Sequence, residues 1–160
     1  MKIPLKFKVN HKEYRLPVES NMTLLDVLRL ELKIKSVHRG CEEGECGACT
    51  VLMNGRPVCS CLIPCPQCDR AEILTLEGLL RDGELHPIMT AFADHYAIQC
   101  GFCTPGMIMT AYYLVNHLEE FTEENIRQAI AGNLCRCTGY VNIIEAIQVA
   151  RRFKDAGNWW

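Results

Sequence analysis

The chain has 160 residues, of which 22% are charged, and its formal net charge of −2 is spread without a basic or acidic block. This balance argues against a nucleic-acid-binding protein, which usually carries a basic patch or stripe. No apolar run is long enough to span a membrane, and residues 1–15 alternate charged with apolar side chains instead of forming the apolar core of a secretory signal. We therefore expect a cytoplasmic protein of one large domain or two small ones.

The N-terminal residues predict a β-hairpin followed by a helix. Apolar side chains alternate with polar ones along residues 3–9 and again along 14–18, which is the period of half-buried strands. Asn10-His11 is a plausible two-residue turn between them. Thr23 to Asp26 resembles a capping box, with Asp in place of the usual Glu, and predicts the start of a short helix.

A second hairpin is predicted around Asn54-Gly55. This dipeptide separates the strand-like runs 50–53 and 56–59, and Asn-Gly is a strong hairpin signal because both turn residues must take positive φ. Residues 73–76 predict a closing strand. Two hairpins that flank a helix indicate a small β-grasp sheet.

The second half of the chain predicts helices. Residues 77–87 are rich in glycine and charge and are typical of a linker. Beyond them, apolar residues recur with helical spacing in four segments, at 88–92, 108–118, 126–130 and 143–153. Thr104, which precedes a proline, and Thr122 are expected to cap two of these helices. We expect a four-helix bundle with cysteines in its loops.

Eight of the eleven cysteines fall into two sets of four. The first set is Cys41, Cys46, Cys49 and Cys61, and the second is Cys100, Cys103, Cys135 and Cys137. The spacing C-x4-C-x2-C with a more distant fourth cysteine is that of plant-type [2Fe–2S] ferredoxins. In a reducing compartment, clustered cysteines are more often metal ligands than disulfides. The two sets together predict an electron relay of two clusters.

Spacing alone leaves the fourth ligand of the first set open. Cys59 and Cys61 are two residues apart on the expected strand, so both side chains point to the same face and alternation does not choose between them. Gly44 and Gly47 suit a loop whose backbone approaches a cluster closely.

The second set admits other interpretations. Four cysteines also hold tetrahedral zinc, although C-x-C is an uncommon half of a zinc site. Cys100-x2-Cys103 has the spacing of a thioredoxin-type redox pair, but it follows a helical pattern and not a strand. Disulfides are disfavoured by the expected compartment.

Four motifs in order give the chain a family resemblance. They are GCEEGECGACTV (40–51), SCL (60–62), QCGFCTPGMIM (99–109) and GNLCRCTGY (132–140). The chain resembles the small iron–sulfur subunit of the xanthine oxidase family of molybdenum hydroxylases. The resemblance implies an α+β fold, with a plant-type ferredoxin-like β-grasp [2Fe–2S] domain over residues 1–78, and a linker and helical [2Fe–2S]-binding domain over 79–160. It also selects Cys61 as the fourth ligand of the first cluster.

The resemblance further implies the partners of the chain. A large catalytic subunit would hold the molybdopterin cofactor near the helical-domain cluster, with Gln99 and Cys137 approaching the pterin. The ferredoxin-like cluster would face a FAD-binding subunit or another acceptor. The chain itself offers no catalytic residue, so it would relay electrons one at a time. A free-standing two-cluster carrier and a zinc-structured binding module are the alternatives.

Some features lie outside both the spacing and the resemblance. Cys59, Cys65 and Cys68 are extra cysteines, and we favour buried thiols that pack as small hydrophobic side chains over an additional metal or redox site. Trp159-Trp160 is expected either to anchor on a partner subunit or to lie in a disordered tail.

Overall fold

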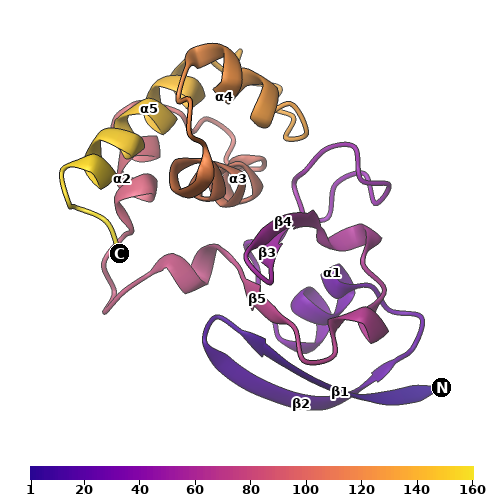
Figure 1. The fold of residues 1–160 in the computed structure, drawn as a ribbon. Helices are drawn as coiled ribbons and strands as arrows, with labels where there is room; N and C mark the ends of the chain where they lie inside the picture. The colour runs from indigo at the N-terminus through magenta and orange to yellow at the C-terminus, as the bar shows by residue number, and fades with distance from the viewer.

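In the computed structural model, which describes all 160 residues, a five-stranded mixed sheet is followed by a helical region (Figure 1). The strand order is β2-β1-β5-β3-β4, in which β1 and β5 are parallel and the other neighbours are antiparallel. The strands are β1 Lys2–Val9, β2 Lys12–Glu19, β3 Thr50–Met53, β4 Arg56–Cys59 and β5 Glu72–Leu74.

Both predicted hairpins are confirmed. Asn10 and His11 have φ of 48° and 68°, and Asn54 and Gly55 have φ of 52° and 77°. Two consecutive positive φ angles give the turn the twist that antiparallel strands need. The closing strand ends at Leu74, two residues earlier than predicted, because a 3₁₀ turn begins at Leu76.

The predicted capping box is confirmed at the start of α1 (Leu24–Asp26). The Thr23 hydroxyl accepts from the backbone N–H of Asp26, and the Asp26 carboxylate accepts from the backbone N–H of Thr23 at 2.8 Å. The helix continues as a wider π-helical turn over Val27–Glu31. Its buried leucines belong to a hydrophobic core that also includes the inner side chains of β1 and β5.

Four helices follow in the second half: α2 Pro87–Asp94, α3 Thr104–His117, α4 Glu123–Ala129 and α5 Val141–Asp155. Helix α5 packs against the other three, and α3 also packs against β3, which places the helices beside the sheet (Figure 1). Together with Leu52 of the sheet, these helices enclose a second hydrophobic core.

One of the two predicted helix caps is correct. Thr122 caps α4, since its hydroxyl accepts from the backbone N–H of Asn125. Thr104 was expected to cap α3 but lies inside it. The carbonyl of Cys103 already accepts the first helical hydrogen bond, from the N–H of Met107, so the helix begins one residue earlier.

Cys65 and Cys68 lie in the sheet core with no exposed surface. The Cys65 thiol lies 3.4 Å from the carbonyl oxygen of Glu19, to which it donates. Burial raises the pKa of both thiols, to about 12 at Cys68. These two residues therefore pack as neutral side chains, as the favoured interpretation predicts.

The C-terminal tail packs on its own chain instead of lying in a disordered tail, and the expected anchoring on a partner subunit stays a prediction, since Trp160 remains exposed. The Trp159 ring stacks on Tyr112, with centroids 5.9 Å apart, and meets the His86 ring edge-on at 4.4 Å. The Nε2 of His86 donates to the main-chain oxygen of Trp160 at 2.7 Å, and its Nδ1 accepts from the N–H of Ile88 at 3.2 Å. His86 thus needs one neutral tautomer to satisfy both contacts.

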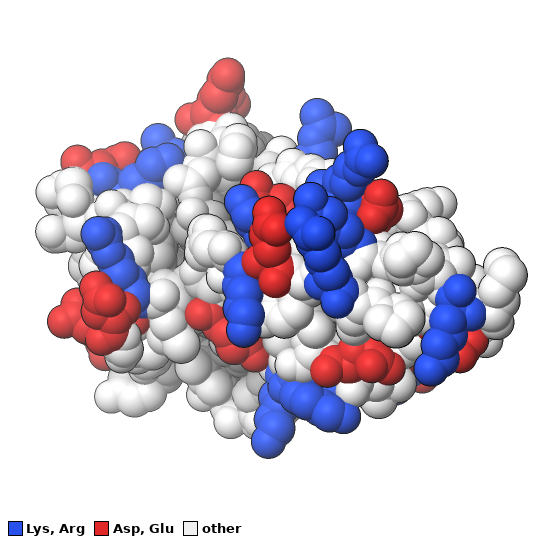
Figure 2. Space-filling model, turned by 90° about the horizontal axis from the view of Figure 1, so that it is seen from below, with Lys and Arg blue, Asp and Glu red and all other residues white.

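Charged side chains of both signs are interspersed on the face shown in Figure 2. None of the helices combines the length and the hydropathy needed to cross a membrane.

We expect acidification to loosen this tail. Burial lowers the pKa of His86 below its ordinary value, so protonation favours the unfolded tail. The stabilisation is complete above a pH of about 6.5 and is lost as pH falls through the lowered folded-state pKa. Tryptophan fluorescence during thermal unfolding should show a midpoint that decreases from pH 7 to pH 5.

The variant His86→Asn keeps an N-cap acceptor but does not titrate, and it should weaken this pH dependence. The exposed His117→Asn is the matched control and should leave it unchanged. An equal pH dependence in all three proteins would contradict the assignment to His86.

Candidate metal centres

The first three predicted ligands lie in a loop whose backbone surrounds one sulfur atom. The N–H groups of Glu43, Glu45 and Cys46 lie 3.3–3.5 Å from Cys41 Sγ, and the N–H of Cys41 lies 3.4 Å from Cys46 Sγ. Hydrogen bonds from the Glu43 and Cys46 backbone lower the pKa of Cys41 to about 7. The loop thus favours a thiolate at Cys41 and places Cys46 beside it.

The fourth predicted ligand, Cys61, lies next to Cys49. It is not on β4, as alternation assumed, but in a 3₁₀ turn over Ser60–Leu62 that follows the strand. Ser60 fixes this turn, because its hydroxyl and its N–H both donate to the carbonyl of Cys49, at 2.8 and 3.4 Å. Burial, followed by the Cys49 thiol, raises the pKa of Cys61 to about 12.

The backbone of Gly44 presents opposite polarity to Cys59 and to Cys61. Its N–H hydrogen-bonds the Cys61 sulfur and works against the rise in the pKa of that thiol. Its carbonyl accepts instead from the Cys59 thiol at 3.6 Å. A backbone N–H stabilises a thiolate, whereas a carbonyl stabilises the protonated thiol. Burial nevertheless raises both pKa values, to about 12 at Cys61 and about 11 at Cys59, so Cys61 remains the ligand that the family resemblance implies.

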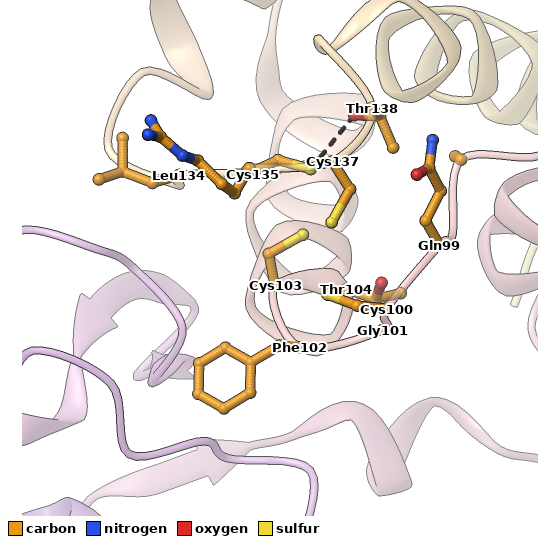
Figure 3. A pocket seen from close by; sticks show the side chains of 12 residues that line it. Gln99, Cys100, Gly101, Phe102, Cys103, Thr104, Leu134, Cys135, Cys137 and Thr138 are labelled. Atoms are coloured by element: carbon orange, nitrogen blue, oxygen red, sulfur yellow. Dashed lines mark hydrogen bonds between the residues drawn. The ribbon is translucent and has the colours of Figure 1, made fainter.

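The second predicted set joins two loops. Cys100 and Cys103 lie between α2 and α3, and Cys135 and Cys137 lie between α4 and α5. All four line a cavity of about 210 Å³, and Figure 3 shows the sulfur atoms of Cys103 and Cys137 directed toward one another. Gln99 also lines this cavity.

Within the second set, the thiols influence one another's pKa in pairs. Burial, followed by a hydrogen bond with Cys135, raises the pKa of Cys103 to about 12. A hydrogen bond with Cys100 raises the pKa of Cys137. At Cys135 burial opposes ionisation, but hydrogen bonds from Thr138, whose hydroxyl lies 3.2 Å away, lower the pKa overall. Cys100 and Cys137 are exposed, whereas Cys103 and Cys135 are partly buried.

This pairing fits two-iron clusters. A [2Fe–2S] centre binds two cysteine thiolates on each iron, and each set of four supplies two pairs. The donor chemistry and the pairwise arrangement therefore fit one [2Fe–2S] cluster in each set.

Direct hydrogen bonds connect the two sets. The N–H of Leu134, which precedes Cys135, donates to the carbonyl of Cys46 at 3.0 Å. The buried Asn133 side chain donates to the carbonyl of Gly47 at 3.0 Å and accepts from the Thr110 hydroxyl at 2.7 Å. The first ligand loop is thereby fixed to the second.

Two further contacts hold the loops together. The His38 ring stacks on Phe102 at 4.8 Å, and its Nδ1 lies 2.7 Å from the Phe102 carbonyl. At Gly106 a Cβ would lie 2.3 Å from the carbonyl oxygen of Gly47, so only glycine permits the approach. Reasoning from the sequence missed His38 and Asn133, because a lone His or Asn carries no spacing signal.

Two family models match the chain. A "2Fe-2S iron-sulfur cluster binding domain" matches residues 5–90, and a "[2Fe-2S] binding domain" matches residues 75–148. Among curated proteins, the nicotinate dehydrogenase small FeS subunit of Eubacterium barkeri is 45% identical over 93% of this chain and 95% of its own length. The caffeine dehydrogenase subunit gamma of Pseudomonas sp. (strain CBB1) is 44% identical over 90% and 88%.

A solved structure shares the whole fold. A chain of quinoline 2-oxidoreductase from Pseudomonas putida 86 superposes with a TM-score of 0.93 at 36% identity and covers 98% of both chains. An aldehyde oxidoreductase from Desulfovibrio desulfuricans matches with a TM-score of 0.90 at 39% identity, and the match covers 97% of this chain but 17% of that one.

The contact at Gly106 gives a test of how tightly the loops must pack. An alanine inside a helix normally gains about 1 kcal/mol over glycine. Gly106→Ala should instead destabilise the protein by about 1–3 kcal/mol, because its methyl group collides with the Gly47 backbone. Urea unfolding followed by circular dichroism measures the change.

Gly132→Ala is the matched control, since a Cβ at Gly132 meets nothing within 4 Å. Its free energy of unfolding should stay within about 0.5 kcal/mol of the parent value. A stabilising Gly106→Ala substitution would show that the two loops have room to separate.

Proposed function

The chain belongs to the iron–sulfur subunits of the xanthine oxidase family of molybdenum hydroxylases, and from this premise we propose how its residues serve electron transfer. Cys41, Cys46, Cys49 and Cys61 hold one [2Fe–2S] cluster. Cys100, Cys103, Cys135 and Cys137 hold the other. Each bound cluster supplies one-electron transfer, so the pair couples a two-electron active site to stepwise exchange with FAD or another acceptor.

The proposal depends above all on the hydrogen bond from the Leu134 N–H to the Cys46 carbonyl. Cys46 belongs to the first set, and Leu134 is bonded directly to Cys135 of the second. A single hydrogen bond therefore completes a main-chain route from one thiolate set to the other. The buried Asn133 side chain holds this route in place. The chain accordingly positions the two sets to work in series.

The second set faces the large catalytic subunit in this proposal. Cys100, Cys137 and Gln99 are exposed at one edge of the cavity, where a cofactor on a partner can approach them. We assign Gln99 and Cys137 to contact with the molybdopterin of that subunit. The exposed apolar side chains of Phe102 and Leu134 lie beside the same cavity and suit burial in a protein interface.

The first set faces the other acceptor. Its loop exposes Glu42, Glu43 and Glu45 beside the partly buried Cys41. We propose that this loop meets a FAD-binding subunit or another electron acceptor. The relatives are named for different substrates although they match nearly the whole chain, which supports assigning substrate chemistry to the large subunit.

The separation of the two cysteine sets along the chain also suggests a division into two domains. We propose that residues 1–78 form the ferredoxin-like domain and that residues 79–160 contain a linker and a four-helix bundle for the second cluster. A cytoplasmic location suits the eleven free cysteines, because thiols stay reduced there.

The experiment is EPR spectroscopy on the complex purified with its partner subunits. Reduction with dithionite should give two distinct [2Fe–2S] signals, and the complex should contain molybdopterin. A chain that purifies alone would support a free-standing carrier, and a colourless chain that contains zinc and no labile sulfide would support a structural module.

A second experiment tests the order in which the two clusters receive electrons. A substrate of the complex is first identified by screening N-heterocycles and aldehydes. In the Cys100→Ala variant, dithionite should still reduce the first cluster, whereas this substrate should no longer reduce it, because the second cluster is missing from the route. Cys68→Ala, which removes a thiol remote from both sets, should leave both modes of reduction intact. Substrate reduction of the first cluster in Cys100→Ala would rule out the series arrangement.

A further inference from the structure

A fifth thiol, that of Cys59, lies close to the loop of the first ligand set. Cys59 is the last residue of β4 and is partly buried. Its thiol lies 3.6 Å from the carbonyl oxygen of Gly44, inside the loop that carries Cys41 and Cys46. Because the Cys59 sulfur is the donor in this hydrogen bond, it carries its proton.

The position of Ser60 explains why the thiols of Cys59 and Cys61 both lie near the first ligand loop. This residue is fully buried and is held to the Cys49 carbonyl by both its hydroxyl and its N–H. Cys59 and Cys61 flank this fixed point, one at the end of the strand and one in the following 3₁₀ turn. The Cys59 thiol donates to the carbonyl of Gly44, and Cys59 pairs with Thr50, the residue after Cys49, in the β3–β4 ladder.

The other two extra cysteines do not share this arrangement. Cys65 and Cys68 have no exposed surface, and their thiols are directed to the carbonyl oxygens of Glu19 and Pro64. They lie in the sheet core, away from the ligand loop. Cys59 alone among the extra cysteines therefore lies where a cluster ligand is needed.

We propose that Cys59 is a reserve ligand of the first cluster, able to bind the iron that Cys61 binds. The inference rests on the proposed function, because it concerns the same cluster. In the exchange the iron–sulfur bond to Cys61 breaks and Cys61 takes up a proton. Cys59 releases a proton to solvent and forms the new iron–sulfur bond. No electron is gained or lost, and the total charge is unchanged.

We infer that Ser60 is the pivot of the exchange. Ser60 stays bound to the Cys49 carbonyl, and the segment turns about it until the Cys59 sulfur leaves the Gly44 carbonyl. Gly44 has a φ of 86°, and its carbonyl already faces the Cys59 thiol. Loss of the hydrogen bond to this carbonyl is offset by thiolate binding to iron.

The test compares Cys61→Ala with Cys59→Ala/Cys61→Ala in the purified complex. Alanine is used because a serine oxygen also binds iron. Cys61→Ala should keep roughly four irons per chain and both EPR signals, with shifted g-values for the first cluster only. The double variant should keep roughly two irons and only the second signal. The second signal reports in each case that the chain has folded and assembled.

Cys61→Ala/Cys68→Ala is the matched control, since it removes a thiol that does not face the loop. It should behave as Cys61→Ala does. Loss of the first signal in Cys61→Ala overturns the proposal, and so does its survival in Cys59→Ala/Cys61→Ala. A parent complex without two signals would instead contradict the proposed function, so the two failures are distinguishable.

Discussion

The structure depends on one close contact between the two ligand loops. Gly47 in the first loop lies against Gly106 at the start of α3 and against Asn133 before α5, so near that no Cβ fits between the backbones at Gly106. Asn133 satisfies the buried Gly47 carbonyl and the Thr110 hydroxyl together. An unpaired buried polar group costs about 1–3 kcal/mol, so the contact fixes one relative placement of the two halves.

This placement sets the geometry of both cysteine sets. With Gly47 and Asn133 locked together, their neighbours Cys46 and Leu134 are brought within hydrogen-bond distance, and Cys135 follows immediately. The two hydrophobic cores on either side are otherwise separate. The sheet and the helices thus hold the two ligand loops in a fixed relative position, and the connection between the two cysteine sets runs through the main chain.

The sequence was informative where a local rule decides the structure. Consecutive positive φ at Asn54-Gly55 and the reciprocal bonds of Thr23 with Asp26 follow from residue chemistry alone. The same reasoning failed at Cys61, because the strand was assumed to continue past Cys59. The carbonyl of Cys49, which turns the chain at Ser60, is eleven residues away. Asn133 and the His86–Trp159 contact escaped prediction for the same reason, since their partners are distant in sequence.

Backbone polarity decides what each thiol around the first loop can do. The pKa of Cys41 is lowered by several N–H donors, and that of Cys59 is raised by burial and then by the Cys49 thiol. At Cys61 burial raises the pKa to about 12, although a hydrogen bond from the Gly44 backbone opposes the rise. The backbone of Gly44 thus meets two thiols that lie two residues apart with opposite polarity. Cysteine spacing indicates where a cluster binds, and the direction of nearby backbone dipoles is a further difference between sulfurs that spacing alone does not distinguish.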